Sequence, residues 1–238
     1  MNTQKGFTLT EILLAVMIVG LIGVALASLT TAASRESAAG NTRAMLRNNL
    51  SIALRQLRQD VHEASRILYV KGPIASISDS DKQPLLVLVK GKNLDDVSIS
   101  EVSKPYVSYC FTRGNINQTS AGEVVQPENY SFDGGTIERR VSVTAPANST
   151  EYCTMGDAAT WLKNVKFISS TYTYGNPSKS YPVPLFELYN YQGDNVGDNY
   201  SLGSILKVNL ITELPSHPVV NEVVEEKILV TNGGGVLP

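Results

Sequence analysis

The sequence predicts an α+β protein in which one long N-terminal α-helix packs against an antiparallel β-sheet domain. Three observations lead to this prediction: an uncharged apolar run near the N-terminus, an amphipathic stretch that continues it, and short apolar or aromatic segments separated by polar turns. With 238 residues, 42% hydrophobic and 18% charged, the chain is apolar enough to bury a core. The formal net charge of −2 is mild. No nucleic-acid partner is predicted, because binding one would need a concentrated basic patch.

The N-terminal apolar run predicts a membrane-spanning helix. No charged residue occurs from Ile12 to Ser34, and a bilayer core takes about 20 apolar residues to cross. Lys5 is the only charged side chain before Glu11, so the positive-inside tendency places the short N-terminus in the cytoplasm and exports the rest. An ordinary cleavable secretory signal is disfavoured, because its candidate site at residues 25–27 lies inside the apolar run.

Glu11 is the informative residue of this segment. A carboxylate at the edge of an apolar helix costs on the order of a few kcal/mol to bury unpaired, and the next basic residue on its C-terminal side is Arg35. Cutting between Gly6 and Phe7 would create an amine at Phe7, four residues before Glu11 and on the same helical face. The amine of one subunit would equally reach Glu11 of its neighbour.

Residues 5–11, Lys-Gly-Phe-Thr-Leu-Thr-Glu, followed by the apolar run, resemble the processing signal of type IV pilins and type II secretion pseudopilins. The resemblance covers residues 4–34, with Thr10 a mild departure from the more usual apolar residue before the acid. It implies cleavage after Gly6 by the prepilin peptidase and methylation of the new amine at Phe7. It also implies that Glu11 neutralises the amine of an adjacent subunit during assembly.

This resemblance gives a domain plan and a set of partners. Residues 1–6 are expected to be the leader, 7–34 the transmembrane and filament-core helix, 35–70 an amphipathic helix, and 71–238 a β-rich periplasmic domain. The implied partners are other pilins or pseudopilins, the prepilin peptidase, the inner-membrane assembly platform, and the lipid bilayer before assembly. The expected location is the inner membrane with a single span, and then the pilus or pseudopilus.

The length favours a minor subunit, similar to the J-type minor pseudopilins or the W-type minor pilins. The alternative is a membrane-anchored periplasmic binding module that does not polymerise. An enzyme is not predicted: the two histidines, His62 and His217, lack a catalytic constellation, and no nucleotide-binding or zinc-binding motif is present.

The amphipathic half of the helix is predicted from an apolar stripe with steps of three and four residues: Leu46, Leu50, Ala53, Leu57, Val61, Ala64 and Leu68. The charged residues of this stretch, among them Asp60, are assigned to its flanks and its other face. Residues 7–68 would form one helix of about 90 Å. Gly72 and Pro73 are expected to end it.

Beyond this point the pattern favours strands at 85–90, 106–112, 137–144, 165–174, 185–191, 205–212 and 227–231. Turns are expected at 133–135, 175–177 and 193–195, where glycine occurs with Asp, Asn or Pro.

Two further side-chain sets have a possible structural role. Cys110 and Cys153 are favoured as a disulfide over two separate buried thiols, because their number is even and the compartment is oxidising. Asp194, Asn195, Asp198 and Asn199 offer oxygen ligands for calcium, and Asp79 and Asp81 form a weaker candidate of the same kind. A plain turn uses the same residue types and is the favoured interpretation of both clusters. No other cofactor is predicted.

Overall fold

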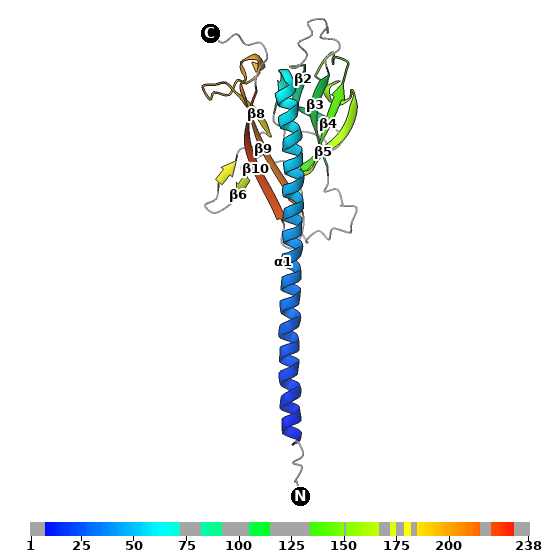
Figure 1. The fold of residues 1–238 in the computed structure, drawn as a ribbon, viewed down its shortest axis with the longest axis vertical. Coiled ribbons are helices and arrows are strands. Elements are labelled where there is room, and N and C mark those ends of the chain that lie inside the picture. The colour runs from blue at the N-terminus through cyan, green and yellow to red at the C-terminus, as the bar shows by residue number, and fades with distance from the viewer. Residues whose placement is uncertain are drawn as a thin grey trace.

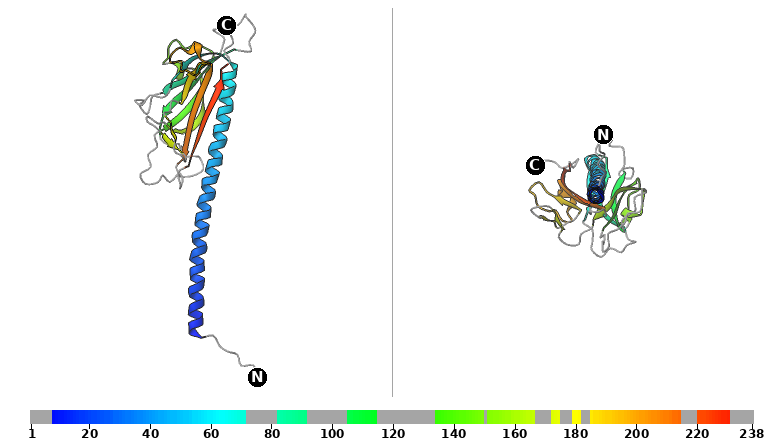
Figure 2. Two further views of the ribbon diagram at one scale, coloured as in Figure 1. Left: turned by 90° about the vertical axis from the view of Figure 1, so that its left-hand side faces the viewer. Right: turned by 90° about the horizontal axis from the view of Figure 1, so that it is seen from below.

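The computed structural model describes residues 8–71, 82–91, 105–114, 134–149, 151–166, 172–174, 179–181, 185–214 and 220–230. The helix α1 (Leu9–Glu63) runs the length of the molecule, and its C-terminal part lies against an antiparallel sheet (Figure 1). Viewed along its axis, the helix lies in the trough of the curled sheet (Figure 2). The α+β class predicted from the sequence is therefore confirmed.

The helix changes character along its length. No side chain from Thr8 to Ala38 is buried, whereas the later part buries one face against the sheet. The buried residues are Ala39, Leu46, Leu50, Ala53, Leu54, Leu57, Asp60 and Val61. Most of them recur every three or four residues, as a helix with 3.6 residues per turn requires. The predicted stripe is thus confirmed from Leu46 to Val61 as the face that contacts the sheet, whereas its last two members, Ala64 and Leu68, lie beyond the helix.

The predicted end of the helix is wrong by several residues. Helix α1 ends at Glu63, and Ala64–Val70 form strand β1, which pairs with β2 (Lys82–Lys90). The register of this pair shifts twice, so the buried residues of β1 are Ala64, Ile67 and Val70, three apart. A spacing of three is also helical, so the apolar pattern alone could not separate this irregular strand from a further helical turn.

All neighbouring strands of the main sheet are antiparallel, in the order β1-β2-β3-β4-β5-β9-β10. Strand β8 is off this path and pairs with the first residues of β9, whereas β5 pairs with β9 near its end. The remaining strands of this sheet are β3 (Tyr106–Arg113), β4 (Gly134–Ser142), β5 (Asp157–Lys166), β8 (Phe186–Tyr189), β9 (Ile205–Leu214) and β10 (Val220–Leu229). Strands β6 (Tyr172–Tyr174) and β7 (Lys179–Tyr181) form a separate pair. Two short 3₁₀ helices are η2 (Glu151–Cys153) and η3 (Tyr200–Leu202).

Most predicted strands exist, but several bounds differ. Of the predicted strand 165–174, residues 165–166 are the end of β5 (Asp157–Lys166) and 172–174 form β6, while 167–171 lie outside the described residues. The turn expected at 133–135 is wrong where the structure describes it: β4 starts at Gly134, and a Cβ on Gly135 would lie 2.0 Å from the Thr112 carbonyl oxygen. Gly135 therefore allows the backbones of β3 and β4 to approach closely. The turn expected at 193–195 lies slightly earlier, since the Gly193 N–H donates to the Asn190 carbonyl oxygen and Asn195 forms a bridge with Tyr189. Residues 175–177 lie outside the described residues.

The core lies between the helix and the concave face of the sheet. Leu57 and Val61 are fully buried there, with aromatic side chains of β3, β5 and β8 around them. The rings of Tyr109 and Trp161 meet edge to face with centroids 4.8 Å apart. The indole Nε1 of Trp161 also donates a hydrogen bond of 3.0 Å to the carbonyl oxygen of Ala53, within the helix. Both apolar burial and a polar contact therefore hold the helix on the sheet.

Candidate assembly site

The N-terminus of α1 is closed by the side chain of Glu11. Its Oε2 accepts hydrogen bonds from the backbone N–H of Thr8, at 2.9 Å, and from the Thr8 hydroxyl, at 2.8 Å. Thr8 is the extended residue immediately before the helix, so Glu11 is in the third helical position and fits the capping-box pattern. Both bonds use Oε2, which leaves Oε1 without a partner among the residues that the structure describes.

The role of Thr8 was missed in the sequence analysis, which considered only a cation as a partner for Glu11. The Thr-x-x-Glu spacing before an apolar run was the available signal. Gly6 and Phe7 lie outside the described residues. Cleavage and methylation therefore stay predictions.

The following turns of the helix expose a continuous apolar surface. Each large apolar side chain in this part is at least 48% exposed: Leu9, Ile12, Leu13, Leu14, Val16, Met17, Ile18, Val19, Leu21, Ile22, Val24, Leu26 and Leu29. The hydroxyls of Ser28, Thr30 and Thr31 donate to the helix's own carbonyls, for example Thr30 Oγ1 to Leu26 O and Thr31 Oγ1 to Ala27 O. The segment therefore satisfies its own polar groups, as a helix surrounded by hydrocarbon must.

At the other end of α1, a buried carboxylate ties the helix to three strands. Asp60 is only 1% exposed. Its Oδ2 accepts from Tyr109 Oη of β3 and from Arg139 Nε of β4, each at 2.6 Å, and its Oδ1 accepts from Arg139 Nη2 at 2.9 Å. Lys90 Nζ of β2 lies 2.7 Å from Oδ1 and 2.8 Å from Glu63 Oε2. The expectation that Asp60 occupies a flank or the other face of the helix is wrong.

The partners of Asp60 determine its charge state. Burial acts to raise the pKa of the Asp60 carboxyl, but hydrogen bonds from Arg139, Lys90 and Tyr109 outweigh it, so this pKa lies below its ordinary value. Burial, with the nearby Asp60 charge, raises the pKa of Tyr109 well above its ordinary value. Asp60 is therefore an anion and Tyr109 a neutral donor at neutral pH. The cluster could have been suspected from an acid that falls between the apolar positions 57 and 61.

Cys110 of β3 and Cys153 of η2 form a disulfide, with their Cα atoms 5.7 Å apart. Both residues are buried. The hydroxyl of Ser108 donates a 2.6 Å hydrogen bond to the Tyr152 carbonyl oxygen beside it. The bridge therefore fastens the connection between β4 and β5 back onto β3, as the favoured interpretation of the cysteines expects.

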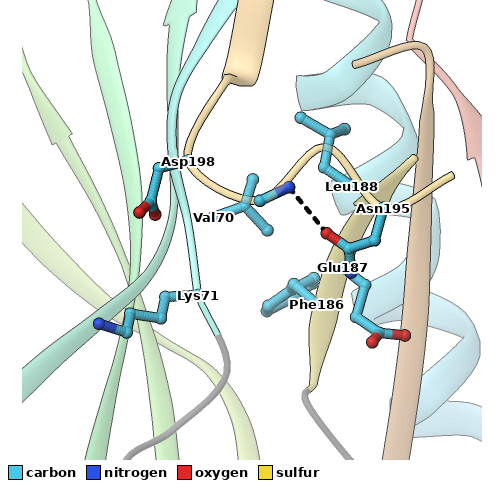
Figure 3. Close-up of a pocket in the computed structure, with 8 residues that line it drawn as sticks. Val70, Lys71, Phe186, Glu187, Leu188, Asn195 and Asp198 are labelled. Carbon is cyan, nitrogen blue, oxygen red and sulfur yellow. Dashed lines mark hydrogen bonds between the residues drawn. The ribbon is translucent and has the colours of Figure 1, made fainter. Parts of the chain in front are cut away.

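The loop that was the stronger calcium candidate, residues 194–199, is held by hydrogen bonds typical of a turn. The side-chain oxygens of Asp194, Asn195, Asp198 and Asn199 accept hydrogen bonds from four different donors within the same loop. Figure 3 shows one of these bonds, from the Gly197 N–H to Asn195. Within the described ranges, no group of three or more His, Cys, Asp or Glu side chains is placed to hold a metal ion. The weaker candidate at 79–81 lies outside those ranges.

Comparison with known proteins bears on the N-terminus. Residues 1–27 match the family model of the prokaryotic N-terminal methylation motif. No curated protein and no solved structure matches the chain. The apolar part of α1 is long enough to cross a membrane, which is compatible with a single-pass inner-membrane anchor. The motif supports the type IV pilin and pseudopilin family, and so a protein processed at its N-terminus with a structural rather than a catalytic role.

Proposed function

We propose that the chain is a minor pilin-like subunit of a type IV pilus or type II secretion pseudopilus, cleaved after Gly6 and assembled through α1. The observation that carries this proposal is the contrast along one continuous helix. Its C-terminal part is buried on the sheet, while its first thirty or so residues expose apolar side chains that only lipid or other helices can cover. Transfer from the bilayer into a filament core exchanges one apolar environment for another.

Glu11 provides a specific contact for that transfer. Within its own chain it uses Oε2 to cap the helix through Thr8, and Oε1 faces no partner in the described part of the chain. We propose that cleavage gives Phe7 a charged amine, and that the amine of a neighbouring subunit binds Glu11 at Oε1. A charge-assisted hydrogen bond in a water-poor core fixes the axial register of two helices, because one residue of displacement moves them 1.5 Å apart.

The Asp60 cluster gives the sheet domain a fixed position on this helix. Three strands and the helix share one buried carboxylate, so force applied to α1 during extraction from the membrane is transmitted to the domain. The sheet domain would then face outward into the periplasm and select partners. Its size relative to the helix favours a minor subunit.

The decisive experiment follows the N-terminus and filament entry together. Mass spectrometry of membranes and sheared filaments should give a mature chain starting at methylated Phe7. The Glu11→Ala variant should be processed and remain in the membrane, yet be absent from filaments. Glu36→Ala is the matched control, because Glu36 is also exposed on α1 but follows the apolar run. It should enter filaments normally.

Two outcomes would overturn the proposal. Filaments containing Glu11→Ala at the native level would remove the assembly role of Glu11. A native chain that keeps residues 1–6 and stays in the membrane would instead indicate an anchored binding module that does not polymerise.

A further inference from the structure

Strand β10 lies at one end of the main sheet, beside α1, so one of its edges has no neighbouring strand (Figure 1). It pairs with β9 over the whole of Val220–Leu229 without a register shift, and it contains no proline. Natural edge strands are usually short, or are interrupted by a bulge or a proline, because a long regular edge binds other strands. Strand β10 has none of these three protections.

The backbone of β10 directs its hydrogen-bonding groups alternately towards β9 and away from it. The Val230 N–H donates to the Ser204 carbonyl oxygen on the β9 side, so the even-numbered residues of the strand face β9. The N–H and C=O groups of the odd-numbered residues therefore point to the free edge. None of these outward backbone groups has a hydrogen-bond partner among the residues that the structure describes.

The strand at the other end of the sheet order, β1, is covered over its last residues. The ring of Tyr69 lies 6.0 Å from that of Tyr152 in η2 and 6.2 Å from that of Tyr200 in η3. The Lys71 N–H donates to β2, so the backbone of the preceding Val70 faces away from β2, where it is hydrogen-bonded to the Tyr200 hydroxyl. Helix η3 thus occupies a position that is open along β10.

The even-numbered side chains of β10 face α1 and do not obstruct the edge. Ile228 belongs to the core, and the carboxylates of Glu222 and Glu226 are paired with Arg47 and Arg58 of the helix. Inward-pointing charges discourage strand addition when they are left unpaired. Here the helix supplies their counter-charges, so an added strand would not have to bury them alone.

The odd-numbered side chains form a row on the outer face of the sheet. The side chain of Glu225 is 47% exposed and Leu229 is 54% exposed, and Lys227 is exposed as well. From Val223 to Leu229 the row is apolar, acidic, basic and apolar in turn. It therefore presents an ordered set of charges and apolar groups directly beside the unpaired backbone.

Backbone donors and acceptors that alternate along an edge are matched by another extended chain. In an antiparallel pair, side chains directly opposite each other lie on one face, and opposite charges there are stabilising. We propose that the free edge of β10 binds an extended segment of a partner protein, with the pattern apolar-x-acidic-x-basic-x-apolar from its N-terminus. Its acidic residue lies opposite Lys227 and its basic residue opposite Glu225. This binding goes beyond the proposed assembly role and does not require the chain to polymerise.

The test uses the full chain in detergent micelles and the blocked peptide Thr-Val-Thr-Glu-Thr-Lys-Thr-Val-Thr, labelled with fluorescein and followed by fluorescence anisotropy. Binding should saturate with a Kd on the order of 100 µM, because a flexible peptide must be ordered as it binds. The matched control is the isomer in which the glutamate and the lysine exchange places. It should bind about fivefold more weakly, because like charges then face Glu225 and Lys227.

A charge reversal in the chain tests the same pairing from the other side. Glu225→Lys should weaken binding of the first peptide about fivefold. A peptide with glutamate in place of its lysine should restore the affinity for this variant, since the two opposite charges are then exchanged.

Two changes to the backbone separate strand addition from attraction between charges. Methylating the peptide nitrogens of the glutamate and the lysine, which face β10, should abolish binding. Methylating those of the two threonines that flank the lysine should change the Kd by less than about twofold, because these nitrogens face away. Glu225→Pro removes an N–H that β9 does not use, so the sheet should persist while the peptide affinity falls at least about tenfold.

The proposal is overturned if the native chain does not bind the first peptide, or if the exchanged isomer binds as tightly. It is also overturned if the two methylated peptides bind equally well, since the contact would then not use the backbone edge. Circular dichroism and the fluorescence of Trp161 show whether each variant is folded. All of these readouts are independent of cleavage after Gly6 and of filament entry.

Discussion

Replacing Asp60 with alanine tests whether the buried carboxylate holds the helix on the sheet. The substitution removes the shared acceptor of Tyr109, Arg139 and Lys90. Removing one partner of a buried ion pair costs about 3–5 kcal/mol, mostly because the remaining charge stays buried without compensation. The side chains of Arg139 and Lys90 are each 18% exposed, and Lys90 keeps Glu63 as a partner. These features place the expected loss at the lower end, about 3 kcal/mol.

The assay is urea unfolding of the full chain in detergent, followed by the fluorescence of Trp161. This is the one tryptophan of the sequence, and it donates to the Ala53 carbonyl of α1, so it reports the contact between helix and sheet. A loss of about 3 kcal/mol corresponds to a decrease in Tm of about 6–12 °C for a chain of this size. Glu225→Ala is the control. Its partly exposed pair with Lys207 should contribute less than about 1 kcal/mol.

A second variant separates the unpaired charges from lost packing. Combining Asp60→Leu with Arg139→Met replaces the pair by apolar side chains and should recover much of the stability that Asp60→Ala loses. The reasoning is refuted if Asp60→Ala unfolds within about 1 kcal/mol of the native chain. It is also refuted if the double variant is less stable than Asp60→Ala.

Three further predictions concern the same domain. The folded-state pKa of Asp60 lies below its ordinary value of 3.8, so the stabilisation by this carboxylate is present above pH 3.8 and is lost as the pH falls below that value. In that acidic range the unfolding free energy of the native chain should fall more steeply with pH than that of Asp60→Ala. Equal slopes for the two chains would contradict this prediction. Changing Cys110 and Cys153 to serine opens a loop of 43 residues and should lower the unfolding free energy by about 4 kcal/mol relative to the oxidised native chain. The reduced native chain should match the variant. Trp161→Phe removes the hydrogen bond to the Ala53 carbonyl and should cost about 1 kcal/mol by circular dichroism, whereas an unchanged Tm would show that the bond contributes nothing.

The position of Glu11 at the start of an apolar helix could be predicted from the sequence. The run from Ile12 to Ser34 has no charge, and Glu11 follows the Thr-x-x-Glu pattern. Both the length of an apolar run and a helix cap depend on residues close together in sequence. The disulfide was predicted only as a pairing of two cysteines. That Cys153 binds the β4–β5 connection to β3 required the fold.

The sequence by itself determined the α+β fold class, the apolar first part of the helix and most of the helical face that packs on the sheet, because these depend on local periodicity and composition. Only the tertiary structure decided where the helix ends. Ala64–Val70 join a sheet by pairing with Lys82–Lys90, a contact between separate segments of the chain. Only the tertiary structure also placed Asp60 among three strands and brought Tyr69, Tyr152 and Tyr200 together. Such long-range contacts are set by the packing of elements distant in sequence, which no local pattern specifies.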